Sequence, residues 1–300
     1  MKQDVIIIGG SFAGLSAAMQ LSRGQRTVTV IDAAQPRNRF ASASHGFFTL
    51  DGETPSAIRE KATQQLSKYN TFTLVNGKAE GATKTEQGFV VTLTDGTELT
   101  SHRLILATGL VDKLPELPGL KERWGQTIVH CPYCHGHELK HHAMGVLATS
   151  AMSSHQAAML PDWGVTTLFT QGEFIPDEEE LAFLQKRGVT IENTPVKEVL
   201  GDAPNIDGVR LADGRVIEIG AMYVGGKTLM ASPIAASLGC EIENSDTGES
   251  IKTDDFKLTS VEGVYACGDI SNQWQNATFA SASGVMAGAA VHQSLIQACI

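Results

Sequence analysis

The sequence predicts an α/β protein made of two units, each with a parallel β-sheet between layers of helices. Three observations indicate this. The 300 residues suffice for two domains at roughly 150 residues each. A buried strand, a glycine-rich turn, a helix and a second strand follow one another near the N-terminus. The tripeptide Ala17-Ala18-Met19 recurs as Ala157-Ala158-Met159, 140 residues later, in a second segment of the same type. Both units are therefore expected to be three-layer, Rossmann-like domains.

The elements of the first half follow from apolar runs and the turn residues between them. A β-branched run at 5–8 is typical of a strand buried on both faces. A hairpin is expected at Asp95-Gly96, between apolar stretches at 89–93 and 98–99. The remaining expected elements are a helix at 15–21, a strand at 27–31 and a buried strand at 103–107 that Thr108-Gly109 ends.

The second half begins with a crossing between units, marked by Pro115 and Pro118. The acidic run 177–180 is typical of a helix N-terminus, and Asp213-Gly214 predicts another hairpin. The other expected elements are a strand at 146–148, a helix at 154–160, strands at 166–170 and 264–266, and a helix rich in small residues at 277–297.

Composition and charge exclude several classes of function. Apolar residues make up 42% and charged residues 19%, as in ordered globular proteins. Lys and Arg number 23 against 33 Asp and Glu, which gives a net charge of −10 without a basic block, so we expect no nucleic-acid or membrane partner. No apolar run reaches the ~18 residues of a membrane span. Five cysteines without an export signal predict a cytoplasmic location.

The turn after the first strand reads Gly9-Gly10-Ser11-Phe12-Ala13-Gly14 and approximates the dinucleotide fingerprint G-x-G-x-x-G. Gly9 allows the tight turn, and Gly14 lets helix and strand pack closely. Ser11 replaces the middle glycine, but its side chain is small and its hydroxyl can donate to a phosphate. Asp32 follows at the end of the second strand, where a carboxylate accepts a hydrogen bond from a ribose hydroxyl. This order predicts a dinucleotide site.

The second copy of the unit lacks this fingerprint. Thr149, Ala151 and Ser154 stand at the positions of Gly9, Ser11 and Gly14, and carry Cβ atoms where close backbone approach is needed. Its second strand ends in the stretch 170–173, Thr-Gln-Gly-Glu, without an arginine for a 2′-phosphate. We therefore expect a scaffold without a nicotinamide site.

Residues 130–142, HCPYCHGHELKHH, contain the motif that carries chemistry. Cys131 and Cys134 fit a redox dithiol, a zinc site completed by histidines, a haem attachment string, or two reduced core cysteines. The polar segment argues against a core position, and haem attachment requires export. The other cysteines have no partner at motif spacing and are expected to be structural or incidental; they are Cys240, Cys267 and Cys299.

As a redox dithiol, the motif would begin a helix. Backbone N–H groups at a helix N-terminus lower the pKa of the first thiol, and Pro132 suits the first helical position. On a continued helix, His135 and Glu138 would share a face with the two cysteines, so that His135 could exchange protons near neutral pH. His137 is a second candidate base.

These residues resemble the low-molecular-weight thioredoxin reductase family of flavoproteins. The resemblance spans the chain and rests on the N-terminal glycine turn, 107–109, the C-x-x-C, 225–228 and Gly268-Asp269. It implies a discontinuous FAD-binding domain, 1–114 and 241–300, around an inserted pyridine-nucleotide-type domain, 115–240. It also implies a homodimer. The implied FAD-binding residues are Gly9, Gly10, Ser11, Phe12, Ala13, Gly14, Asp32, Thr108, Gly109, Gly268, Asp269 and Ala277.

The resemblance assigns separate roles to the two cysteines: Cys134 would lie next to the flavin, and Cys131 would exchange with substrate. His135 stands where the reductases carry an acid, and the chain lacks their nicotinamide loop and arginine cluster. The CPYCHGHE string is similar instead to the flavin-dependent dithiol oxidases of the gliotoxin and holomycin type.

That similarity implies oxidation of a small-molecule or peptide dithiol through Cys131 and Cys134, with His135, His137 or Glu138 moving protons, oxygen as acceptor and no resident metal. The alternatives are an NADPH-dependent thioredoxin-disulfide reductase and a non-catalytic metal- or ligand-binding protein on the same fold.

Overall fold

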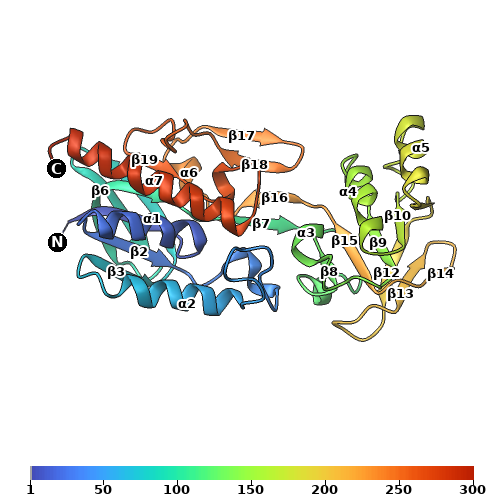
Figure 1. Ribbon diagram of the computed structural model, residues 1–300. Coiled ribbons are helices and arrows are strands. Elements are labelled where there is room, and N and C mark those ends of the chain that lie inside the picture. The colour runs from blue at the N-terminus through green and yellow to red at the C-terminus, as the bar shows by residue number, and fades with distance from the viewer. Residues whose placement is uncertain (1) are drawn as a thin grey trace. The chain divides into compact units, whose positions relative to one another are not determined.

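The computed structural model describes residues 2–300 and divides the chain into two compact units. The first unit contains the residues up to Arg37, Pro55–Asp112 and Thr228–Ile300. The second contains Asn38–Thr54 and Lys113–Lys227. Two separate stretches of chain therefore build the second unit, and Figure 1 labels most helices and strands of the two units.

The first unit is built on a seven-stranded sheet with the order β3-β2-β1-β6-β5-β4 and with β19 beside β6. Its strands are β1 (Gln3–Ile8), β2 (Val28–Asp32), β3 (Phe72–Asn76), β4 (Ala79–Thr85), β5 (Gly88–Leu93), β6 (Glu98–Leu106) and β19 (Val264–Ala266). β1 pairs in parallel with β2 and β6, as expected of an α/β unit. The predicted strands at 5–8, 27–31 and 264–266 are confirmed.

The predicted hairpin at Asp95-Gly96 is also confirmed, since it joins the antiparallel strands β5 and β6. The stretches 98–99 and 103–107, expected as two strands, form the single strand β6. Its first half pairs with β5, and its second half pairs with β1 and β19, so one long strand links the hairpin to the parallel part of the sheet.

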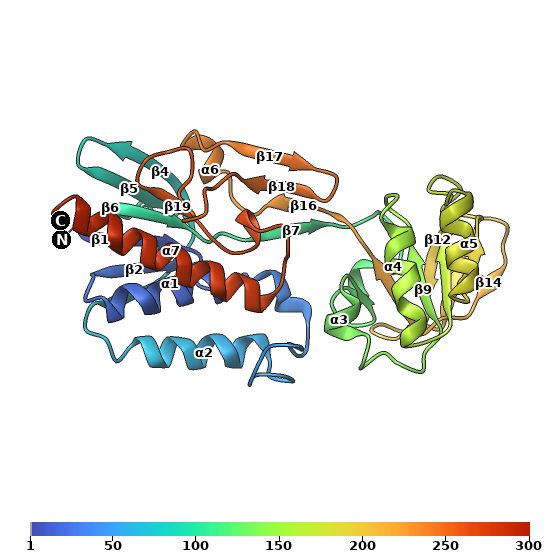
Figure 2. The same ribbon diagram turned by 45° about the horizontal axis from the view of Figure 1, so that its top comes forward.

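Helices α1 (Phe12–Arg23), α2 (Pro55–Leu66) and α7 (Ala277–Gln297) belong to the first unit, and α1 and α7 lie side by side (Figures 1 and 2). Successive strand residues point to opposite faces of a sheet. Val5 and Ile7 accordingly pack into the apolar cluster that holds α1 and α7, while Ile6 and Ile8 pack into the cluster on the other face. α7 has the predicted bounds.

A four-stranded sheet of order β17-β18-β16-β7 completes the first unit. Its members are β7 (Leu110–Lys113), β16 (Lys227–Met230), β17 (Ile242–Ser245) and β18 (Gly248–Ile251), with α6 (Ile234–Ser237) between them. The compact units thus differ from the boundary at 240 and 241 inferred from the resemblance. Residues 228–240 belong to the first unit, because Ile234, Ala235 and Cys240 are buried in the same apolar cluster as Ile6 and Ile8.

The second unit holds a five-stranded parallel sheet of order β11-β10-β9-β15-β8. These strands are β8 (Ile128–Val129), β9 (Met144–Leu147), β10 (Thr166–Phe169), β11 (Thr190–Glu192) and β15 (Ala221–Val224). Helix α4 (Ser153–Met159) follows β9, and α5 (Glu178–Lys186) follows β10. The second βαβ unit is therefore confirmed, and both units are Rossmann-like.

Two further predictions for the second unit are confirmed. Asp177 caps α5 by accepting a hydrogen bond from the Glu180 backbone N–H at 2.9 Å, while the Glu180 carboxylate accepts one from the Asp177 N–H. Asp213-Gly214 joins β13 (Gly208–Leu211) to β14 (Val216–Ile217), which with β12 (Val196–Leu200) form a three-stranded antiparallel sheet.

The segment Asn38–Thr54 was not expected in the second unit, where contacts with residues 113–227 hold it. Gly125 is one such contact, since a Cβ added there would lie 2.6 Å from the Cβ of Phe40. Among the described residues, no helix combines the length and the apolarity needed to cross a membrane.

Candidate functional site

The glycine turn between β1 and α1 is fixed by close backbone approach. Gly9 has a φ of +113°, and a Cβ there would lie 2.1 Å from the carbonyl oxygen of Ala107. A Cβ on Gly14 would lie 1.8 Å from the carbonyl oxygen of Gly9. The turn and the end of β6 thus pack directly against each other, which brings Thr108 and Gly109 next to Gly9.

Ser11 occupies the N-cap position of α1, but its side chain makes no capping hydrogen bond within residues 2–300. The first turn, Phe12 to Leu15, contains no acidic residue that would neutralise the helix N-terminus. Backbone N–H groups at such a helix start bind anions, phosphate groups in particular. The Ser11 hydroxyl remains available to donate to the same anion.

Asp32 lies at the end of β2, beside the glycine turn. Its Oδ1 accepts hydrogen bonds from the N–H groups of Gly10 at 3.3 Å and Ala34 at 3.1 Å, and its Oδ2 pairs with Arg59 of α2. Arg59 also donates to the carbonyl oxygen of Gly10 at 3.2 Å. Because a carboxylate offers about four acceptor positions, Asp32 can still accept from a ribose hydroxyl.

Gly268 and Asp269 follow β19 and face a buried charge network. Arg37 donates through Nη1 to Asp269 at 3.1 Å and to Gln275 Oε1 at 2.6 Å, and through Nε to Asp112 at 3.0 Å. Burial raises the pKa of Asp269, although the Arg37 charge acts in the opposite direction. Burial opposes the charge on Arg37, yet the hydrogen bond and charge of Asp112 leave its pKa raised.

The expected cofactor residues therefore gather at one edge of the first unit's sheet, where β1, β2, β6 and β19 end and α1 and α7 begin. Ala277 is the first residue of α7, and Asn276 caps that helix by accepting from the Phe279 N–H at 2.8 Å. The carboxyl edge of a parallel sheet is where α/β domains bind ligands.

The two motif cysteines lie at the start of α3 (Pro132–His135) in the second unit, with their sulfur atoms 2.7 Å apart. Cys131 is the N-cap and Pro132 the first helical residue, as predicted. The helix ends after one turn, so the expectation of a continued helical face reaching Glu138 is wrong. Both cysteines are half-buried, which leaves them within reach of a substrate.

His135 is the half-buried histidine of this cluster. Burial lowers its pKa, the charge of His45 lowers it further, and Glu138 raises it. The imidazole is thus neutral at pH 7 and able to accept a proton. His137 is exposed and lies 3.3 Å from the Nζ of Lys140, on the solvent side of the turn.

Tyr223 of β15 lies in the same region and was not anticipated. It is fully buried, pairs in register with Val129 of β8, and its hydroxyl has no hydrogen-bond partner within residues 2–300. Burial raises its pKa, and charges on Cys131, Glu138 and Cys134 raise it further, so the phenol stays protonated.

The turn after β9, where a nucleotide would bind in the second unit, is closed by its own side chains. The N–H of Thr149 donates to Ser153 Oγ at 3.2 Å, and the Thr149 hydroxyl donates to the carbonyl oxygen of Gly225. Thr170, at the end of β10, donates to Asn193 at 2.8 Å. The polar side chains of this turn thus bond within the second unit.

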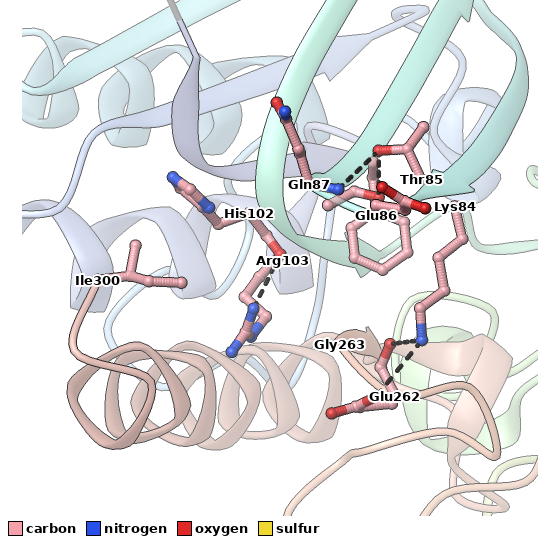
Figure 3. A pocket seen from close by; sticks show the side chains of 11 residues that line it. Lys84, Thr85, Glu86, Gln87, His102, Arg103, Glu262, Gly263 and Ile300 are labelled. Atoms are coloured by element: carbon pink, nitrogen blue, oxygen red, sulfur yellow. Dashed lines mark hydrogen bonds and ion pairs between the residues drawn. The ribbon is translucent and has the colours of Figure 1, made fainter.

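A surface pocket in the first unit lies beside the β4–β5 hairpin (Figure 3). Its cations are already engaged, because Lys84 donates to the carbonyl oxygen of Glu262 at 3.1 Å and Arg103 donates to Ser294 Oγ at 3.0 Å. None of the site residues expected from the sequence lines this pocket.

Comparison with known proteins decides the family. A family model described as pyridine nucleotide-disulphide oxidoreductase matches residues 3–284. The chain belongs to this family. It is 31% identical to "Thioredoxin reductase sirT" of Leptosphaeria maculans, over 96% of this chain and 93% of that protein. It is 45% identical to a solved oxidoreductase from Agrobacterium tumefaciens, with a TM-score of 0.95 over 99% of both chains. It is 32% identical to the solved structure of HlmI, with a TM-score of 0.91 over 99% of this chain and 93% of that one.

As a thioredoxin reductase-like member of this family, the protein is an FAD-dependent disulfide oxidoreductase. The first unit fits FAD, since among the described residues the α1 N-terminus has neither a side-chain cap nor an acidic first turn to compete with a pyrophosphate, and Asp32 suits the ribose. The non-catalytic alternative is left without support. Within residues 2–300, no three His, Cys, Asp or Glu side chains gather as a metal site.

Sequence reasoning missed Arg37, Arg59, His45, Tyr223 and also Gln156, whose side-chain amide donates to the carbonyl oxygen of His130 at 2.6 Å. Arg37 and His45 lie in an irregular stretch without periodicity, and Arg59 reads as an ordinary helix residue. Tyr223 belongs to a uniformly apolar strand. Only folding brings these side chains to the two sites, and no spacing in the sequence signals it.

Proposed function

We propose that the protein is a dithiol oxidase: it oxidises a small-molecule or peptide dithiol to a disulfide through Cys131 and Cys134, with oxygen as the final electron acceptor. The contrast between the two Rossmann-like units carries this proposal. The first keeps glycines at the two positions where a Cβ would meet backbone, whereas the corresponding turn of the second is bonded to itself through Thr149, Ser153 and Gly225. Electrons are therefore proposed to enter through sulfur.

The reaction starts from the Cys131–Cys134 disulfide, which the 2.7 Å sulfur separation allows to close. A substrate thiol gives its proton to neutral His135, and the resulting thiolate attacks Cys131. The S–S bond breaks, and Cys134 leaves as a thiolate that takes the proton from His135.

The second substrate thiol then attacks the substrate sulfur of the mixed disulfide, again passing its proton through His135. Cys131 is released as a thiol, and the substrate leaves as a disulfide. Two electrons and two protons have moved from the substrate to the cysteine pair, so the exchange is balanced. When bound, FAD supplies the two-electron acceptor that returns the pair to its disulfide and passes electrons to oxygen.

The proposed assembly is a homodimer, supported by the outer face of α7. This helix contains no Asp, Glu, Lys or Arg, and it exposes Phe279, Val285, Met286 and Ile296. Large apolar side chains exposed along an uncharged helix are typical of protein interfaces. Size-exclusion chromatography with light scattering should give a dimer, and Met286→Lys should shift it towards monomer. The proposed compartment is the cytoplasm, where substrate thiols stay reduced.

Anaerobic mixing of the yellow holoenzyme tests the function. Dithiothreitol, used as the dithiol probe, should bleach the flavin band within the turnover time, while NADPH and NADH should not. Air should then restore the band and consume oxygen. Rapid bleaching by NADPH would instead establish the alternative, an NADPH-dependent thioredoxin-disulfide reductase, which the name of the sirT relative favours.

A further inference from the structure

The segment Asn38–Thr54 brings a histidine to the dithiol's unit in a defined position. Ser44 and Glu53 form an antiparallel bridge that closes the loop, with the Ser44 N–H donating to the Glu53 carbonyl oxygen at 2.8 Å. Inside the loop, Asp51 Oδ1 accepts from the Gly46 N–H at 2.7 Å. The loop thereby fixes the backbone on both sides of His45.

Two carboxylates face the same ring nitrogen of His45. Nδ1 lies 3.7 Å from Asp51 Oδ1 and 3.6 Å from Glu138 Oε1, and the His45 side chain is only 19% exposed. Two carboxylates within 4 Å of one ring nitrogen place negative charge beside Nδ1 and favour an N–H group there over a lone pair. Asp51 is 71% exposed, so Glu138, at 39%, is the partner less screened by water.

Glu138 links this histidine to the dithiol helix. The N–H of Leu139 donates to the carbonyl oxygen of His135 at 3.1 Å, so the chain continues in a tight turn after α3. Glu138 therefore lies three residues beyond His135, on the turn that this hydrogen bond joins to the dithiol helix. The three side chains that result are a base, His135, a carboxylate, Glu138, and a second imidazole, His45.

We propose that His45 is a positioning residue for the dithiol: it holds the Glu138 carboxylate beside His135, and this pair governs proton exchange between His135 and the two cysteines. The inference rests on the proposed use of Cys131 and Cys134 in thiol–disulfide exchange. When His135 takes a substrate proton it becomes an imidazolium, which a fixed carboxylate stabilises and a mobile one does not.

The charged groups around Glu138 and His135 determine whether each substitution raises or lowers the pKa of His135. Asp51 faces His45 from its own loop, His135 and the cysteines lie on α3, and Tyr223 of β15 interacts with the Glu138 charge. Burial lowers the pKa of His135, as does His45, and Glu138 raises it. Removing the Glu138 charge should lower that pKa further, whereas removing only the His45 charge should raise it.

His45→Asn and Glu138→Gln distinguish the effect of a side chain's charge on His135 from the effect of its position. An Asn amide places an N–H group at about the position of Nδ1 and carries no charge, so it keeps a polar group facing Glu138 and removes the charge. In imidazole NMR titrations of the holoprotein, the His135 signal, assigned with His135→Asn, should titrate at higher pH in His45→Asn and at lower pH in Glu138→Gln. The His102 signal, from the first unit, should titrate at the same pH in every variant.

The kinetic experiment measures only the first thiol–disulfide exchange, between the oxidised cysteine pair and the dithiol. Oxidised holoenzyme is mixed anaerobically with dithiothreitol, and the newly formed cysteine thiols are trapped with iodoacetamide and counted by mass. His45→Ala should slow this exchange about tenfold, His45→Asn should stay within about twofold of wild type, and His45→Ala in a Glu138→Gln background should add nothing. His155→Asn, an exposed histidine on α4, is the matched control.

A His45→Ala rate equal to wild type, or an undiminished effect in the Glu138→Gln background, would overturn the inference. So would shifts of the His135 titration in the same direction for both single variants. Failure of the proposed function looks different: wild-type enzyme would then exchange with dithiothreitol but consume no oxygen, and the ordering of the variants would be unaffected.

Discussion

Gln156 donates a 2.6 Å hydrogen bond from its side-chain amide to the carbonyl oxygen of His130, the residue before Cys131. Gln156 lies on α4, the helix that would bind phosphate in a working nucleotide site. In this protein that helix supports the dithiol loop instead. The side-chain oxygen of Gln156 is buried without a hydrogen-bond partner among the described residues. The hydrogen bond from its amide nitrogen to His130 is therefore the polar contact that fixes this side chain.

Gln156→Met should destabilise the protein by about 1 kcal/mol, the net value of one hydrogen bond, and should slow the first exchange with dithiothreitol several-fold. The reason is that the backbone before Cys131 loses a fixed contact. Chemical denaturation and quenched alkylation measure the two effects, and FAD content should be unchanged. Gln65→Met on α2 is the control, since that side chain is exposed. Equal exchange rates for both variants would contradict the assignment.

Replacing Cys131 or Cys134 with Ser should reduce dithiol oxidation about a thousandfold or more while leaving the protein yellow, because the proposed reaction uses both cysteines for exchange and assigns the cofactor to the first unit. Mixed with an aromatic disulfide, which acts as the oxidant in place of the missing intramolecular disulfide, Cys134→Ser should accumulate a mixed disulfide at Cys131 and release one equivalent of aromatic thiol, as mass spectrometry and absorbance detect. Cys131→Ser should not form this adduct at position 131. Cys299→Ser, at an exposed position, should retain full activity. Substantial activity in both motif variants would contradict the proposed reaction.

Gly14→Ala should destabilise the protein by about 3 kcal/mol and lower its FAD content, because the new Cβ would meet the backbone oxygen of Gly9 at 1.8 Å. Backbone cannot yield as a flexible side chain can. Gly81→Ala is the matched control, since a Cβ there meets nothing within 4 Å. Thermal unfolding and the ratio of flavin to protein absorbance report both properties. Normal FAD content in Gly14→Ala would argue against binding of FAD at the glycine turn.

The rate of dithiol oxidation should persist to pH values below 6.5 before it falls on acidification. Burial and the neighbouring His45 lower the pKa of His135 from 6.5, so the neutral imidazole survives at more acidic pH. Initial rates between about pH 5 and pH 8 give the midpoint of this fall in rate. In His135→Asn, the fall in rate on acidification should be absent. A midpoint above 6.5 would contradict the assignment.

The same shift affects stability. The unfolded chain binds the His135 proton more tightly than the folded chain, so this group makes the fold less stable as pH falls through 6.5.

The sequence alone determined the elements and the chemistry that they carry. Continuous apolar strands, the turn from Gly9 to Gly14 and the pair Cys131 and Cys134 are local patterns, and each has a physical meaning within a few residues. Helix α7 and the capped start of α5 were predictable for the same reason. The tertiary structure decided what long-range contacts create. It placed Ile234 and its neighbours in the first unit, ended α3 after one turn, and brought His45, Tyr223 and Gln156 to the dithiol's unit. Such contacts depend on which surfaces bury one another, and no spacing along the chain records that.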